Sequence, residues 1–253
     1  MTQPGRRLER ARSFGPAALL YDQVRPSYPV EAIRWALAPL GPGRHHVADV
    51  GAGTGILTRV LGSMGHDVVA IEPDPHMREQ LSAATPGVEV LDGRAEAIPL
   101  PDGLLDAAMA GQAYHWFDGE VAHRELARVI RPGGVFTAVW NERDTTVPWL
   151  AAYSRIVDPD RQPGRYSGRR EVDTFGDGFE PVEQADFRHT VACTPDLLVS
   201  LMKTRSYFLT ASEQRQVELD AAVRRLTQEH PDLAGSAQFP LPYVVEVFRA
   251  RRR

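Results

Sequence analysis

The chain has 253 residues, of which 43% are hydrophobic, and a formal net charge of −4. This length fits one large α/β domain, or a core domain with a small cap. The nearly balanced charge argues against a nucleic-acid-binding protein, and we expect the Arg251–Arg253 tail to be a solvated end. The single cysteine, Cys193, excludes an internal disulfide. No apolar run approaches the roughly 20 residues that span a bilayer, so we expect a cytoplasmic protein.

Strand and helix signals alternate from residue 46 onward, which predicts βαβ units around a mostly parallel sheet. In chain order, the first half is expected to contain a strand at 46–50, a helix at 54–64, a strand at 67–72, a helix at 75–84, and strands at 88–91 and 105–110. A helix at 120–130, a turn at 131–134 and a strand at 135–140 follow. The polar section 158–178 is expected to be a surface loop. The last predicted elements are a strand at 187–194, helices at 195–207 and 212–229, and a strand at 243–248.

The most informative segment is the loop that follows the first predicted strand. Gly51, Gly53 and Gly55 stand at every second position, and without Cβ atoms they let the backbone approach a ligand closely. Asp49 precedes the loop on the strand itself, and Glu72 ends the next strand. A strand, a glycine loop, a helix and a second strand tipped with a carboxylate form half of a nucleoside-binding α/β domain.

The spacing of this loop separates two classes of nucleoside. The pattern G-x-G-x-G differs from the G-x-G-x-x-G fingerprint of dinucleotide sites. Asp49 would repel a pyrophosphate, whereas it suits a ligand with an ammonium or sulfonium group. Glu72 suits the ribose of either class. These residues favour S-adenosyl-L-methionine (SAM), and leave an NAD(P)-dependent oxidoreductase and a SAM-binding protein without turnover as alternatives.

Several motifs together resemble the class I, seven-stranded SAM-dependent methyltransferases. The resemblance is to the small-molecule branch that includes ubiquinone/menaquinone-biosynthesis and trans-aconitate methyltransferases. The motifs are VADVGAGTG at 47–55, AIEPD at 70–74, GRAEAIPL at 93–100, QAYHWF at 112–117, RPGG at 131–134 and YDQVRPSYP at 21–29. The resemblance implies an α/β fold with a seven-stranded, mostly parallel sheet, helices on both faces, and the last strand antiparallel beside the fifth.

We expect residues 1–40 to form a lid segment and residues 41–253 the SAM-binding domain, with substrate-cap elements around 145–180 and 195–235. The resemblance implies that SAM is the cofactor and S-adenosyl-L-homocysteine the product. Arg94 stands where many relatives carry an acid, so recognition of the adenine falls to Ala95 or Glu96. The implied cofactor-binding residues are Asp49, Gly51, Ala52, Gly53, Gly55, Glu72, Pro73, Ala95, Glu96, Gln112, Tyr21 and Arg25. Tyr28 belongs to the same lid segment.

Methyl transfer from a sulfonium is an SN2 displacement that needs alignment and exclusion of water, and it requires no metal. His115, just after the fourth predicted strand, is the candidate general base. The alternative is that His115 packs locally and shapes the pocket floor. Trp116, Trp140, Arg205 and Tyr207 are candidate substrate-binding residues.

The expected partner is a small-molecule acceptor, without nucleic acid or membrane, and the expected assembly is a monomer or a homodimer. Two features indicate different acceptor classes. Arginines of the predicted surface loop would suit an acidic acceptor, or are simply solvated: Arg161, Arg165, Arg169 and Arg170. Aromatic residues in the second half of the chain would suit a flat, apolar acceptor.

Overall fold

The computed structural model describes residues 18–158 and 172–253, so the four loop arginines and residues 1–17 of the predicted lid lie outside the described residues. A seven-stranded sheet has the order β3-β2-β1-β4-β5-β7-β6. The strands are β1 His46–Val50, β2 Asp67–Ile71, β3 Glu89–Leu91, β4 Leu105–Gly111, β5 Ile130–Arg143, β6 Glu183–Cys193 and β7 Phe239–Arg251. The first five run parallel, and β7 pairs antiparallel with both β5 and β6. The expected α/β architecture is confirmed.

Helices cover both faces of the sheet because successive residues of the central strands are apolar on both sides. In β1, Val47 packs with α3 (Val30–Leu37) and α4 (Ile56–Ser63), whereas Ala48 belongs to the cluster that contains α6 (Gly119–Val129). Helix α5 (Pro75–Ala84) adds Leu81 beside Ala70 of β2. The central strands are therefore buried on both faces, and their carboxyl ends are the surfaces open to ligands.

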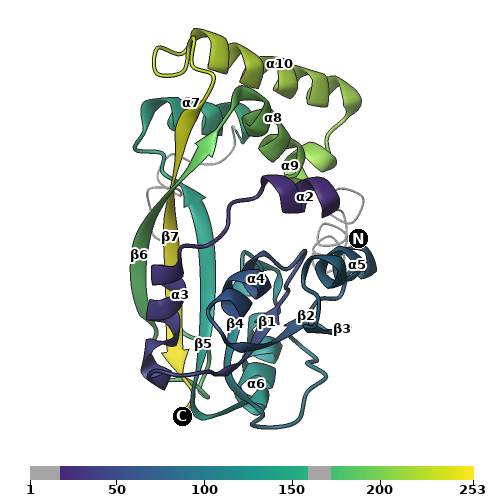
Figure 1. Ribbon diagram of the computed structural model, residues 1–253, viewed down its shortest axis with the longest axis vertical. Coiled ribbons are helices and arrows are strands. Elements are labelled where there is room, and N and C mark those ends of the chain that lie inside the picture. The colour runs from purple at the N-terminus through teal and green to yellow at the C-terminus, as the bar shows by residue number, and fades with distance from the viewer. Residues whose placement is uncertain (1–17, 159–171) are drawn as a thin grey trace.

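A second group of helices lies beyond the carboxyl ends of the strands (Figure 1). We call this group the cap: α7 Pro148–Val157, α8 Pro195–Lys203, α9 Ser206–Leu209 and α10 Glu213–Glu229. The cap has its own apolar cluster, which includes Tyr153, Leu198 and Val223 together with Phe239 and Tyr243 of β7. Helix α2 (Ala18–Val24) lies between the cap and the sheet and contacts α8 and α5 (Figure 1).

Several predicted boundaries are wrong where long-range pairing decides them. Strands β6 and β7 pair continuously from Glu183↔Arg249 to Cys193↔Phe239, so both are longer than the predicted apolar runs. The predicted turn at 131–134 lies inside β5 as an irregularity between two paired stretches. The helix expected at 195–207 is divided after Lys203 into α8 and α9. None of the helices in the described ranges is long and apolar enough to cross a membrane.

Candidate active site

The loop after β1 is shaped by glycines in the left-handed region. Gly51 has φ 71° and Gly53 has φ 58°. A Cβ at Gly51 would lie 2.7 Å from the Cβ of Ala113, so this position has no room for a side chain. A Cβ at Gly53 would meet nothing within 4 Å. The Gly53 N–H donates to the Glu72 carboxylate at 2.8 Å, which ties the loop to the end of β2 and leaves its other side open.

Two buried carboxylates stand beside this loop. Asp49 is 1% exposed and accepts a hydrogen bond of 2.7 Å from the Thr58 hydroxyl. Burial raises the pKa of Asp49 to about 7. Glu72 accepts backbone N–H groups from Gly53 and Asp74, and burial raises the pKa of Glu72 as well. The ionised form of each carboxylate is stabilised by a cation or by further hydrogen-bond donors beside it.

A cavity of about 690 Å³ joins the loop to the cap. Its wall includes the glycine loop, Glu72 and the segment Arg94–Glu96 on the sheet side. Tyr21 and Arg25, from α2 and its end, and Arg205, between α8 and α9, also line it. The cavity therefore lies where open α/β sheets bind their ligands, at the carboxyl ends of the strands.

Residues after β4 supply a further part of the wall. Gln112 has φ 58°, and it is the non-glycine residue with positive φ within the described ranges. Its N–H donates to the Val139 carbonyl at 2.8 Å, and its side chain donates to the Asn141 carbonyl at 2.9 Å. Such a conformation costs about 1–3 kcal/mol, and these bonds to β5 hold it in place.

His115 lines the cavity and is bonded from behind by Trp140. The Trp140 Nε1–H donates to Nδ1 of His115 at 3.4 Å, and the ring also packs on Trp116 with centroids 4.6 Å apart. A neutral imidazole that accepts at Nδ1 carries its proton on Nε2. In this tautomer Nε2 is a hydrogen-bond donor.

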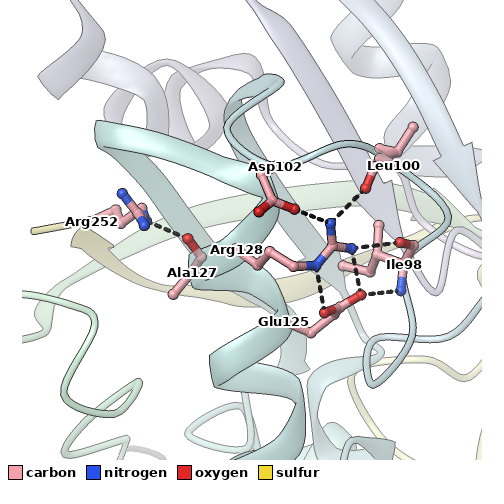
Figure 2. A network of polar contacts seen from close by, with 7 residues as sticks. All are labelled: Ile98, Leu100, Asp102, Glu125, Ala127, Arg128 and Arg252. Atoms are coloured by element: carbon pink, nitrogen blue, oxygen red, sulfur yellow. Dashed lines mark hydrogen bonds and ion pairs between the residues drawn. The ribbon is translucent and has the colours of Figure 1, made fainter.

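Figure 2 shows how α6 fixes the loop that follows β3. The guanidinium of Arg128 donates to the carbonyls of Ile98 (2.9 Å) and Leu100 (2.8 Å) and to the carboxylates of Asp102 and Glu125 (2.7 Å each). Glu125 in turn accepts the Ile98 N–H at 2.8 Å. Because the loop is bound along its length, the preceding residues Arg94–Glu96 are held against the cavity.

Comparison with known proteins agrees with this geometry. Residues 48–138 match the family described as "Methyltransferase domain". An uncharacterized methyltransferase of Mycobacterium tuberculosis is 41% identical, over 96% of this chain and 97% of its own length. The chain belongs to the SAM-dependent methyltransferases. The oxidoreductase alternative finds no support in these relatives.

Solved structures share the fold of this methyltransferase. A protein described as a type II methyltransferase from Anaeromyxobacter dehalogenans superposes with a TM-score of 0.63 at 26% identity, covering 90% of this chain and 97% of its own. An N-methyltransferase of Haemonchus contortus bound to S-adenosylhomocysteine has a TM-score of 0.56 at 14% identity, covering all of this chain and 60% of its own. The cofactor of this methyltransferase is SAM.

The residues of the methyltransferase fit SAM on structural grounds. The space over Gly53 is open, and the hydroxyl of Thr54 is buried without a partner among the described residues. SAM carries an ammonium, a sulfonium and ribose hydroxyls, which complement Asp49 and Glu72.

Most of the predicted site residues lie in the cavity wall. These are Asp49, Gly51, Ala52, Gly53, Glu72, Pro73, Ala95, Glu96, Gln112, Tyr21, Arg25, His115, Trp116 and Arg205. Three others are placed outside it. Gly55 faces α5, where its Cβ would lie 3.1 Å from Leu81. Trp140 is 1% exposed behind His115, and Tyr207 packs against the apolar cluster of the cap.

Sequence reasoning missed several residues of the wall: Met77, Phe117, Asp118, Gly119 and Val121. Asp118 and Gly119 begin α6, and Met77 belongs to the first turn of α5. The predicted helix starts could have indicated these residues, because helices that follow the strands of a βαβ unit begin at the ligand-binding edge of the sheet.

Proposed function

We propose that this methyltransferase transfers the methyl group of SAM to a small organic acceptor bound under the cap. The cavity that runs from the glycine loop to Arg205 carries the proposal. Its volume of about 690 Å³ lies within the range of roughly 300–1,000 Å³ typical of small-molecule sites. The acceptor reaches the cofactor between α2 and the residues that follow β4.

The cofactor contacts follow from the chemistry of the wall. Glu72 accepts the ribose hydroxyls, since each carboxylate oxygen can take a bond besides its backbone N–H donor. Asp49 lies beside the methionine ammonium. Ala95 and Glu96 flank the adenine, and Arg25 binds the methionine carboxylate. Tyr21 closes over the same end, where its ring lies 4.4 Å from the Arg25 guanidinium carbon.

The reaction requires little chemistry from the protein. Bound SAM supplies a methyl group on a sulfonium leaving group. The chain holds the acceptor atom in line and excludes water by closing α2 against the cap. His115 donates a hydrogen bond from Nε2 that orients the acceptor, because Trp140 occupies Nδ1.

Substitution of His115 tests this donor role. Glutamine has an amide N–H near the position of Nε2, so His115→Gln should keep most of kcat, whereas His115→Ala should lose about tenfold or more. SAM affinity should stay constant in both variants. A general base predicts equal losses in the two, with a pH profile shifted by the substitution. The measurement is kcat against pH with an acceptor found as described below.

Calorimetric titration with SAM, S-adenosylhomocysteine and NAD(H) tests the cofactor site. Glu72→Ala should weaken SAM binding about tenfold or more, since it removes the ribose acceptor. Glu79→Ala is the matched control, because Glu79 is an exposed acid on α5. Binding of NAD(H), or equal affinity in the two variants, would contradict the assigned site.

The acceptor class is tested with SAM that carries a labelled methyl group. We expect the label to enter low-mass compounds when the enzyme is incubated with a fractionated cell extract. Transfer into the protein or nucleic-acid fraction alone would contradict a small-molecule acceptor.

A further inference from the structure

Two arginines meet at the cap end of the cavity. Arg25 follows α2 and Arg205 lies between α8 and α9, and both line the wall. Arg25 donates to the hydroxyl of Thr204 at 3.0 Å and to its carbonyl at 2.8 Å, both neutral acceptors. Within the described ranges, neither arginine forms an ion pair with a carboxylate.

Among the residues that the structure describes, no carboxylate is a main influence on the pKa of Arg25. Burial and the positive charge of Arg205 lower the pKa of Arg25 to about 10, so Arg25 stays protonated at neutral pH. The other groups that interact with Arg25 are tyrosines: Tyr21, Tyr207 and Tyr243. Two cations side by side in a partly buried cavity repel each other unless an anion lies between them.

A third arginine lies outside the cavity wall but interacts with the same tyrosines as Arg25. Arg143, 7% exposed at the end of β5, interacts with Tyr207 and Tyr243, as Arg25 does. The hydroxyl of Tyr207 is buried outside the cavity wall and has no hydrogen-bond partner among the described residues. The buried acids of the wall, Asp49 and Glu72, belong to the glycine-loop side instead.

SAM has too little negative charge to neutralise both Arg25 and Arg205. The methionine carboxylate supplies one negative charge, and the proposed function assigns it to Arg25. Arg205 then lines the cavity with no anionic partner in the part of the chain that the structure describes. It projects from the cap, and the proposed function places the acceptor under the cap.

We propose that the methyl acceptor carries an anionic group, a carboxylate or a phosphate, that binds Arg205 at the cap end of the cavity. This inference rests on the proposed function of the same cavity. The anionic group is an anchor and is separate from the methylated atom, because the positive charge of a bound guanidinium lowers the nucleophilicity of the carboxylate or phosphate that it holds. Arg205 therefore selects acidic acceptors and sets the distance between the anchor and the methyl group.

Titration of the S-adenosylhomocysteine complex tests the anchor without a known acceptor. Succinate, inorganic phosphate and uncharged succinamide are added to protein saturated with S-adenosylhomocysteine, and binding is followed by calorimetry. We expect succinate or phosphate to bind and succinamide not to bind. Tighter binding of succinate assigns a carboxylate anchor, and tighter binding of phosphate assigns a phosphate.

Variants assign the anion to Arg205. Arg205→Gln should weaken anion binding about tenfold or more, and Arg205→Lys should weaken it less because the charge remains. Arg215→Gln, at an exposed arginine of α10, should have no effect. All three variants should bind S-adenosylhomocysteine within about twofold of the parent, which also shows that they fold.

Failure of the anchor and failure of the proposed function give different results. No anion binding to the complex, or equal anion binding in Arg205→Gln and the parent, would overturn the anchor. Loss of S-adenosylhomocysteine binding in Arg205→Gln would overturn it as well, because Arg205 would then belong to the cofactor. A parent protein that binds no S-adenosylhomocysteine would contradict the proposed function itself.

Discussion

Residues in and beside the glycine loop differ in their protonation and in the space around them. Asp49 has a pKa of about 7 because it is buried, so it is partly protonated at neutral pH. Gly51 and Gly53 both have positive φ, but the first faces Ala113 and the second faces open space. Two positions of one loop therefore differ in the room they leave for a side chain.

The pKa of Asp49 predicts that SAM affinity rises with pH and levels off above about 7. The ionised carboxylate attracts the cationic ligand, so binding favours loss of the proton. The stability of the ligand-free protein depends on pH in the opposite sense. Because burial raises the pKa of Asp49 above 3.8, the contribution of Asp49 to stability falls as pH rises from 3.8 to about 7. Calorimetry from about pH 5.5 to about pH 8.5, in buffers of different ionisation enthalpy, should detect proton release. Asp49→Asn should abolish this release; release that persists would contradict the assignment.

Alanine at the two glycines should separate stability from binding. Gly51→Ala adds a Cβ against Ala113 in a left-handed conformation, so the free energy of unfolding should fall by about 2–4 kcal/mol. Gly53→Ala meets no protein atom and should cost only about 1–2 kcal/mol, while it weakens SAM binding by filling the open space. Urea unfolding and calorimetric titration measure the two effects. Equal stability losses with normal SAM affinity in Gly53→Ala would show that the loop does not face the cofactor.

At the scale of elements, helices act by holding the loops that line the cavity. Helix α6 binds the loop after β3 through Arg128 and Glu125 (Figure 2). The hydrogen bond from Arg128 is the main cause that lowers the pKa of Glu125, so the stabilising effect of Glu125 is present above the ordinary pKa of glutamate and is lost on acidification. The part of the cavity wall at Arg94–Glu96 thus depends on a polar network outside the wall.

Arg128→Ala should lower the free energy of unfolding by about 1–3 kcal/mol, because it leaves two loop carbonyls and two carboxylates without a shared donor. SAM affinity should fall with it, since Arg94–Glu96 lose their support. Arg124→Ala removes another arginine of α6 whose pair with Glu120 is exposed, and it should change stability by less than about 0.5 kcal/mol. Thermal unfolding with and without S-adenosylhomocysteine measures both variants. Equal behaviour of the two would contradict the role of the network.

For the whole molecule, the sheet and the cap have separate apolar clusters, joined by the long strands β5 and β7 and by α2 (Figure 1). Helix α2 is fixed at two points. Arg25 bonds Thr204 after α8, and Asp22 pairs with Arg59 of α4 at 2.6 Å. The cavity is lined by residues at the sheet edge, by Tyr21 and Arg25, and by Arg205 of the cap, so ligand binding should order α2 between the sheet and the cap.

Asp22→Asn should therefore weaken SAM binding several-fold with little loss of stability. The pair with Arg59 is partly exposed and contributes about 1 kcal/mol or less. Hydrogen exchange in Ala18–Val24 should become faster in the variant, and S-adenosylhomocysteine should slow it in the parent. Asp67→Asn, which removes an exposed pair with Arg44 remote from the cavity wall, is the control. Unchanged exchange in α2 on ligand binding would contradict closure by this helix.

The sequence alone predicted a mostly parallel sheet and favoured SAM as the cofactor, and both predictions are confirmed. These features depend on local patterns: apolar runs such as Asp67–Ile71, glycines where the backbone turns, and acids such as Asp49 and Glu72 at strand ends. The family resemblance added the antiparallel last strand, which the structure confirms.

Only the tertiary structure decided which distant residues share the cavity. Arg25 and Arg205 meet because α2 packs against α8, and no pattern within either segment predicts that contact. Trp140 and Tyr207 are aromatic residues at plausible positions, yet packing turns Trp140 behind His115 and Tyr207 into the cap. The physical reason is that periodicity fixes the face of an element locally, whereas the neighbour of that face depends on how whole elements pack.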